Sequence, residues 1–353
     1  MSTTIPSPRQ RLLLIPVVVA VGSLFYLVLR SHQSVGLVGF GATQSFHDLG
    51  NAASVSKADV VVPHYYSEGL DINSHICKLH GWTAREEQSF GWPRVSAFRI
   101  FDAMVFEGQL DLLEIRLNEL DPVVDRFFIV EHSDVPNDHT FAQNRDRFKK
   151  FQKKISYKKI LGSRVHTRAE MTKFIRAHVV ELPPSFPPPL VIMSNADEIP
   201  AAHTVELLRS CDFGDEIRLE LRNYMFSFEF FSEQTSSQIP AQRWKSDSEY
   251  RPAPSRGVVL ADSGWHCSYC YRYVDDIALA HMRASGAPPE HTMDVLQEAV
   301  CKGHNLLSTP KLPSAKILTS GVHLPLFLVQ KYERFGFLLP GGCQREVPAN
   351  ATI

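Results

Sequence analysis

A chain of 353 residues, 44% of them hydrophobic, is long enough to bury a large core in one large domain or two modest ones. Its 37 basic and 38 acidic side chains give a formal net charge of -1, which argues against nucleic acid as the main partner.

The N-terminus carries an uncharged apolar segment, residues 12–29, which predicts a transmembrane helix. At a rise of about 1.5 Å per residue, a segment of this length spans a thin bilayer. Arg9 and Arg11 favour a cytoplasmic location for the preceding tail, residues 1–11, so the rest of the chain would face a lumen. A cleaved signal peptide is the alternative, but such cores are usually shorter and end at an A-x-A-like site.

Residues 30–76 are interpreted as a stem or linker, because most of this stretch is rich in Ser, Gly, Val and Ala with little periodicity. We expect a folded domain over residues 77–345 and a short tail over 346–353. An even number of cysteines follows the apolar segment, which indicates disulfides in an oxidising lumen. These are Cys77, Cys211, Cys267, Cys270, Cys301 and Cys343.

A βαβ unit is predicted next. The apolar run 97–106, with Asp102 inside it, is typical of a strand, and residues 108–120 place four leucines on one helical face. A second apolar run, 123–132, ends at Glu131. Strand, helix and strand in this order favour a parallel sheet.

The stretch "LVIMSNADEIP" predicts a further buried strand at 190–193, followed by polar side chains. Ligands bind at the carboxyl ends of parallel strands, and adjacent carboxylates repel unless a cation offsets them. Asp197 and Glu198 therefore indicate a site, which Glu131 would share. Alternatively, they are first-turn acids of a helix beginning near Pro200.

The run 145–160 holds eight cations and one Asp. We interpret it as a solvent-facing helix, with attraction of a diphosphate as the alternative. Residues 218–231 alternate as a strand with one solvated face, and the phenylalanines around Glu229 are expected in the core.

Aromatic and polar side chains gather at 261–273, where Asp262, Trp265 and His266 precede two tyrosines. Aromatic rings beside a carboxylate suit sugar binding. Cys267 and Cys270 also have zinc-ligand spacing. A zinc set completed by Cys301 with Cys343 or His304 is the alternative to disulfides.

Five stretches, in order, resemble glycosyltransferase family 17: 101–131, 193–200, 224–230, 264–273 and 324–341. The resemblance implies an α/β, GT-A-like nucleotide-sugar transferase fold with a mostly parallel central sheet behind a membrane anchor. It implies inverting transfer of N-acetylglucosamine from UDP-N-acetylglucosamine to the β-linked core mannose of N-glycans, giving a bisecting β-1,4 branch. The enzyme would be a single-pass type II protein of the Golgi membrane, anchored by residues 12–29, with its catalytic domain in the lumen.

The resemblance also implies roles for residues. A divalent cation, Mn²⁺ or Mg²⁺, would bind Asp197 with Glu198 as helper. Asn195 stands where the best-known member has Asp, which weakens metal dependence, although the amide still accepts from a ribose hydroxyl. Asp102 and Glu131 join Asn195 as expected donor-binding residues.

Inversion needs one direct displacement and a base for the acceptor hydroxyl. We rank Asp262 first, His266 second and Glu229 third. The alternative for Glu229 is a structural acid, and for His266 a histidine satisfied within the fold or bound to zinc.

Two regions depart from the family pattern. The loop at 134–148 is compressed, and the stretch between Lys159 and Leu190 has lost the Gln-Arg-containing helix that is usual in the family. Two other functions therefore stay open: a related transferase with another acceptor or donor, and a catalytically silent lumenal glycan-binding protein.

Overall fold

The computed structural model describes residues 59–85, 98–132, 140–161, 164–250, 257–286, 292–304 and 315–346. All of them belong to the unit Ala58–Ile353. The predicted membrane segment and its tail lie outside the described residues. Within the described ranges, no helix is long and apolar enough to cross a bilayer.

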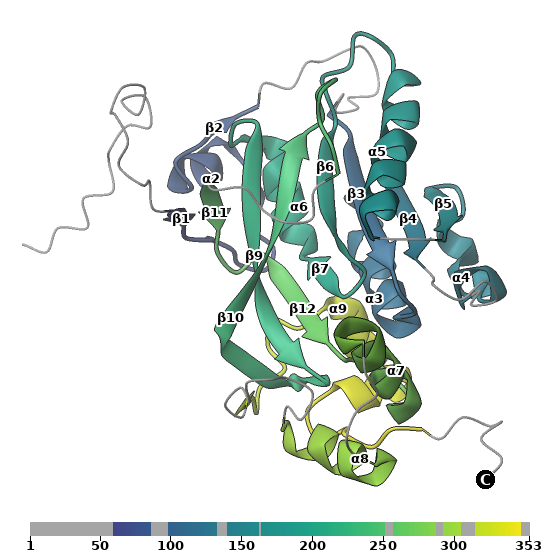
Figure 1. The fold of residues 1–353 in the computed structure, drawn as a ribbon. Coiled ribbons are helices and arrows are strands. Elements are labelled where there is room, and N and C mark those ends of the chain that lie inside the picture. Colours follow the sequence, from purple (N-terminus) through teal and green to yellow (C-terminus); the bar gives the residue numbers. More distant parts are fainter. Residues whose placement is uncertain are drawn as a thin grey trace, which may run out of the picture. The chain divides into compact units, whose positions relative to one another are not determined.

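Four parallel strands form one half of the central sheet (Figure 1). They lie in the order β6, β3, β4, β5. Their bounds are β3 (Ile100–Phe106), β4 (Arg126–His132), β5 (Ile155–Ile160) and β6 (Leu190–Asn195). The α/β class and the mostly parallel sheet are confirmed.

Strand β3 is apolar except at Asp102, because both of its faces are covered. Ile100 packs in the cluster that contains Leu113 of α3 (Leu110–Leu120). Its neighbour Phe101 points the other way, into the cluster that contains Met171 of α5 (Arg164–Val180). The predicted βαβ unit is therefore present, with β3 and β4 parallel.

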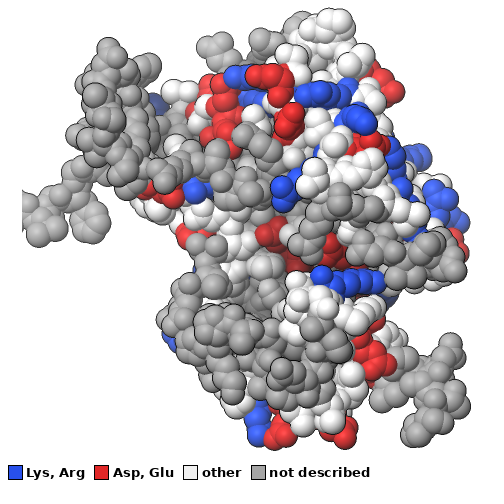
Figure 2. All heavy atoms as spheres, in the orientation of Figure 1, with Lys and Arg blue, Asp and Glu red and all other residues white. Residues whose placement is uncertain are grey.

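The basic run is a helix only in its first half. Residues Arg145–Phe151 form the 3-10 helix η2, which follows the short α4 (Thr140–Gln143), and the remainder is strand β5. The expectation of one solvated helix was wrong because this segment pairs with β4 at the sheet edge. Lysines suit such an edge, since their charge discourages pairing with another chain. Figure 2 shows basic side chains gathered on the side that carries β5 and α5.

The stretch between Lys159 and Leu190, which departs from the family pattern in sequence, still forms a helix. The 17-residue α5 lies there and returns the chain from β5 to β6. A parallel sheet requires such a crossover, and Met171 and Ile175 are fully buried on it.

The other half of the sheet is built around a long hairpin. Strands β9 (Glu216–Met225) and β10 (Ser227–Arg243) are antiparallel and turn at Phe226, whose φ is 63°. Strand β10 also pairs with β6, which joins the two halves. The predicted strand at 218–231 is thus two strands, and Phe226, Phe228 and Phe230 lie in the core as expected.

Short strands complete this half. Strand β12 (Gly264–Ser268) runs parallel to β9 and antiparallel to β7 (Glu198–Pro200). Strand β1 (Val60–Val62) pairs with β11 (Val258–Leu260), which pairs with β9, and β13 (Lys316–Ile317) pairs with β10. Strand β1 falls inside the expected stem, so the folded unit begins before residue 77.

The remaining elements surround this sheet (Figure 1). Near β1 lie α2 (Ser74–Leu79), β2 (Thr83–Ala84), α6 (Ala202–Ser210) and β8 (Cys211–Asp212). Next to the turn of the hairpin lie α7 (Val274–Ser285), α8 (Met293–Lys302), α9 (Leu326–Gln330), α10 (Tyr332–Phe335) and η3 (Gly336–Leu338).

Disulfides use all six cysteines. The pairs are Cys77–Cys211, Cys267–Cys270 and Cys301–Cys343. The prediction of disulfides is confirmed. The zinc alternative is removed, because no free thiolate is left for it.

Candidate functional site

The site lies where the strand order of the sheet reverses. The chain passes from β3 to β4 on one side and later adds β6 on the other side of β3. In open α/β sheets, ligands bind outside the carboxyl ends of the strands at such a point. The turn Asn195–Glu198 leaves β6 there, and the amide of Ala196 donates to the carbonyl of Val105 on β3.

A buried arginine of α3 holds this turn. Arg116 is fully buried, and its Nε and Nη2 atoms donate to the two carboxylate oxygens of Asp102 at 2.9 and 2.6 Å. Nη2 also donates to Ser194 Oγ at 2.6 Å. Nη1 donates to the carbonyls of Asn195 and Glu198 at 2.7 and 2.6 Å. All five guanidinium hydrogens are thereby used.

This arrangement corrects the donor-binding role expected of Asp102. The carboxylate is 0% exposed and engaged by the arginine, so it cannot touch a ligand. The Asp102 carboxylate instead balances the positive charge of the Arg116 guanidinium, which binds the turn. Asn195, by contrast, is exposed at the end of β6, as a ribose contact requires.

The Glu198 side chain also stabilises this turn. One carboxylate oxygen accepts from the amide of Asn195 at 2.8 Å, and the other accepts from Ser237 Oγ of β10 at 2.6 Å. These bonds favour a structural role over the metal-helper role expected of it. The helix-capping alternative is wrong, since Glu198 lies in β7 and α6 begins only at Ala202.

Asp197 has the properties of a cation ligand. Its Oδ1 is buried, and no hydrogen-bond partner for it exists among the described residues. Its Oδ2 lies 3.7 Å from His266 Nε2. A buried carboxylate oxygen without a partner is costly, and a divalent cation would satisfy it.

The described residues contain no cluster of three or more His, Cys, Asp or Glu that could hold a metal. A cation at Asp197 would therefore take its other ligands from diphosphate oxygens and water, as Mg²⁺ often does. The residues present fit a substrate-bridging cation rather than an all-protein metal cage.

His266 is oriented toward Asp197 by its neighbour on β9. Asn223 Oδ1 lies 2.9 Å from His266 Nδ1 and can only accept, so Nδ1 carries a proton and Nε2 faces Asp197. Burial disfavours the imidazolium. The carboxylates of Asp197 and Glu198 outweigh burial and raise the pKa of His266 above its ordinary value.

The structure separates Asp262 from this group. Arg222 binds the Asp262 carboxylate at 2.5 Å, while the next residue of β9, Asn223, binds His266. Successive strand residues point to opposite faces. Asp262 and His266 therefore do not flank one acceptor, as the sequence led us to expect.

The other two expected site acids are structural in this fold. Glu229 Oε2 accepts from the amide of Gly341 at 2.9 Å, which ties β10 to the C-terminal segment. Glu131 is 2% exposed and accepts from the Tyr157 hydroxyl at 2.6 Å. Burial and this carboxylate raise the pKa of Tyr157 above its ordinary value.

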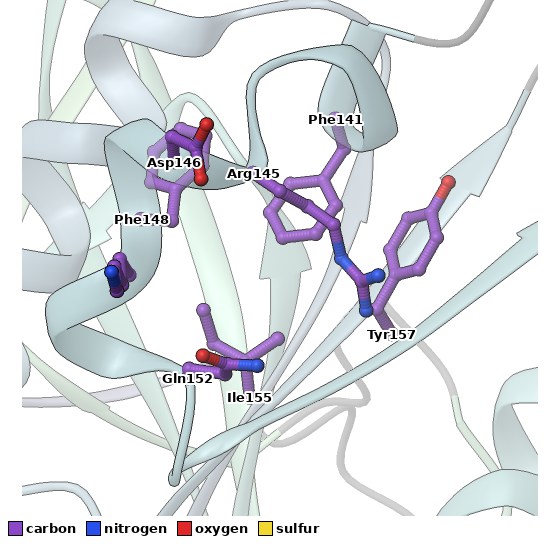
Figure 3. A pocket seen from close by; sticks show the side chains of 8 residues that line it. Phe141, Arg145, Asp146, Phe148, Gln152, Ile155 and Tyr157 are labelled. Carbon is purple, nitrogen blue, oxygen red and sulfur yellow. The ribbon is translucent and has the colours of Figure 1, made fainter.

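A cavity of about 470 Å³ lies beside Tyr157, between η2 and β5. Figure 3 shows Arg145 reaching toward the Tyr157 ring, with Phe141 beside it. The rings of Phe141 and Tyr157 are stacked at 4.5 Å. The cavity offers cationic and aromatic contacts, but its lining comes from α4, η2, Gln152 after η2, and β5, and not from the turn after β6.

Sequence reasoning missed three residues that shape the site: Arg116, Asn223 and Ser237. The sequence does point to a residue such as Arg116, because Asp102 lies inside an apolar strand and a buried acid requires a partner. Asn223 and Ser237 had none, since only strand pairing brings them to His266 and Glu198.

The family model of glycosyltransferase family 17 matches residues 17–346. The chain belongs to glycosyltransferase family 17. No curated protein matches it. A solved structure, a mannosyltransferase from Pyrobaculum calidifontis in complex with GDP-Man and Mn²⁺, is similar at 12% identity and a TM-score of 0.31. The similarity covers 56% of this chain and 68% of that one, and it is too small to carry an argument.

Replacing Arg116 tests how this turn is held. Arg116→Met leaves the Asp102 carboxylate buried without a partner, which should lower the free energy of unfolding by about 3–5 kcal/mol in urea titrations. Arg99→Met is the matched control, since Arg99 pairs with Asp125 at a partly exposed site. The two variants losing equal stability would contradict the role assigned to Arg116.

Replacing Asp197 tests the cation ligand. Asp197→Asn keeps the shape and removes the charge, so transferase activity should fall by about 10²–10³, as for loss of one preorganised electrostatic contact. Asn195→Asp should tighten the dependence of activity on added Mn²⁺. Unchanged activity of Asp197→Asn, or full wild-type activity in excess EDTA, would contradict the assignment.

Proposed function

We propose that this family 17 glycosyltransferase is an inverting enzyme that transfers N-acetylglucosamine from UDP-N-acetylglucosamine to the β-linked core mannose of N-glycans. Family membership supports glycosyl transfer. The observation that carries the mechanism is the buried Oδ1 of Asp197 at the carboxyl end of β6, which has no hydrogen-bond partner among the described residues. The bisecting β-1,4 linkage rests on the family resemblance alone.

Each residue of the turn has a distinct task in this mechanism. A divalent cation held by Asp197 would offset the charge of the diphosphate leaving group. Arg116 and Glu198 fix the backbone on either side of Asp197, so that its carboxylate needs no rearrangement when the donor binds. Asn195 offers its amide oxygen to a ribose hydroxyl.

His266 is the base we assign to the acceptor hydroxyl. Of the three residues ranked from the sequence, it alone contacts Asp197. Its Nδ1 is held by Asn223, which leaves Nε2 to take the proton as the hydroxyl attacks. Asp262 and Glu229 are engaged elsewhere, by Arg222 and by the amide of Gly341.

A donor panel tests the function. Purified protein is incubated with an N-glycan acceptor, Mn²⁺ and each common UDP-sugar in turn. The masses of the glycan products are then measured by mass spectrometry. We expect one added N-acetylhexosamine, and only with UDP-N-acetylglucosamine. Transfer from another donor would establish the related-transferase alternative. No transfer and no UDP release from any donor would favour the silent glycan-binding protein.

Three single variants test the base. His266→Gln should lower kcat by about 10²–10⁴ with little change in donor KM, because proton removal matters only in the transition state. Asp262→Asn and Glu229→Gln should lower kcat far less. A larger kcat loss for Asp262→Asn than for His266→Gln would reinstate the sequence-based ranking.

We place the enzyme in the Golgi membrane, anchored by residues 12–29 with the catalytic unit in the lumen. The three disulfides support an oxidising compartment. Protease added to intact vesicles should spare residues 31–353, and their digestion would overturn this orientation.

A further inference from the structure

A second cavity, of about 190 Å³, lies at the start of β12. It is bordered by side chains from four separate parts of the chain, most of them aromatic or imidazole. They are His64, Tyr66, His203, Asp262, Trp265 and His323.

This cavity opens on the opposite face of β9 from Asp197. Asp262 is bound there by Arg222, whereas Asn223 and His266 point to the transfer side. A molecule bound in the cavity is therefore separated by the sheet from Asp197.

The walls of the cavity are fixed by the backbone. Ser263 donates its amide to the Glu220 carbonyl at 2.8 Å, and its own carbonyl accepts from Ala201 and from Thr204 Oγ. Gly264 has a φ of +156°, and a Cβ there would lie 2.2 Å from the Ile199 carbonyl oxygen. The turn and the start of α6 are in close contact, so the cavity is preformed.

The cavity has little net charge. The Asp262 carboxylate is balanced by Arg222. Burial lowers the pKa of His64 below its ordinary value and lowers the pKa of His203 to about 4, so both rings are neutral at neutral pH. His64 Nδ1 lies 3.0 Å from the Asp262 carbonyl, which can only accept, so the remaining nitrogen of the neutral His64 ring is an acceptor for a ligand hydroxyl.

Aromatic surface accompanies these polar groups. The Tyr66 ring stacks on His203 with centroids 3.7 Å apart and planes 13° apart, and Tyr66 remains 43% exposed. Trp265 forms another part of the lining, with its Nε1 donating to the His323 carbonyl at 2.7 Å. The indole thus presents its apolar surface rather than its donor.

These properties define the ligand class. The described residues offer no metal-binding cluster here, and the absence of net positive charge disfavours an anion. Cavities for drug-sized ligands have volumes of roughly 300–1,000 Å³, so this one suits a smaller molecule. A neutral pyranose ring meets each requirement, with hydroxyls for the imidazoles and Asp262 and an apolar face for the aromatic rings.

We propose that this cavity binds one neutral sugar residue of a glycan, at a place distinct from the site of transfer. The proposal does not depend on which donor or acceptor the enzyme uses, so its test can fail independently of the proposed function. In a branched glycan, such a contact holds one arm while another reaches the transfer site, which strengthens binding through effective concentration.

The test uses the full-length chain in a detergent without a sugar head group. Methyl α-mannoside, methyl β-N-acetylglucosaminide and methyl β-galactoside are each titrated by saturation-transfer NMR, without UDP-sugar or Mn²⁺. We expect saturable binding of at least one, with Kd on the order of 1 mM. Tyr66→Ala should weaken it about 10-fold or more, while Tyr66→Phe, which keeps the ring, should retain it.

Two variants serve as controls. Tyr65→Ala removes an equally exposed tyrosine that packs on His80 instead of lining the cavity, and it should bind like the wild type. Asp197→Asn should also bind normally. If Tyr66→Ala melts at a lower temperature, Asp262→Asn replaces it as the deciding variant, with the same weakening expected.

Two results would overturn the proposal. One is the absence of saturable binding of all three glycosides to the wild type. The other is binding that survives Tyr66→Ala and Asp262→Asn but is lost in Asp197→Asn, which would place the sugar in the transfer site.

Discussion

The guanidinium of Arg116 donates all of its hydrogens inside the protein, to Asp102, Ser194 and the two carbonyls that begin and end the Asn195–Glu198 turn. Removing either charge would leave the other buried without compensation. Because the bonds join α3, β3 and the end of β6, the packing of the βαβ unit and the position of the turn depend on one another. The same hydrogen bonds therefore stabilise both the core of the sheet and the candidate site.

Few side chains of the turn remain available to a ligand. Glu198 is consumed in closing it, and Asn195 contributes an amide instead of a charge, so Asp197 is the carboxylate left to meet a cation. A site with one anionic ligand binds metal well only when a diphosphate completes the coordination. In the proposed mechanism, cation binding at Asp197 therefore depends on donor binding.

Strand β9 divides the chemistry of the C-terminal half. Its alternation sends Asn223 toward His266 and Asp197, and Arg222 toward Asp262 and the histidine-lined cavity. Residues that are neighbours in sequence, such as Asp262 and His266, thereby serve opposite faces of one sheet. The proposed transfer site and the proposed glycan contact thus lie on opposite faces of the same two strands.

The sequence by itself determined the βαβ unit, the strand before Asp197, the disulfide chemistry and the family, because these follow from local apolar patterning, cysteine number and short ordered motifs. It could not decide the strand formed by Ile155–Ile160, since a lysine-rich edge strand differs from a solvated helix only through its partner β4. It also could not distinguish Asp197, whose Oδ1 has no partner in the described part of the chain, from four other acids that are engaged by other groups: Asp102, Glu131, Glu229 and Asp262. Only the tertiary structure made that distinction, because the partners of a carboxylate come from distant segments that pairing and packing bring together.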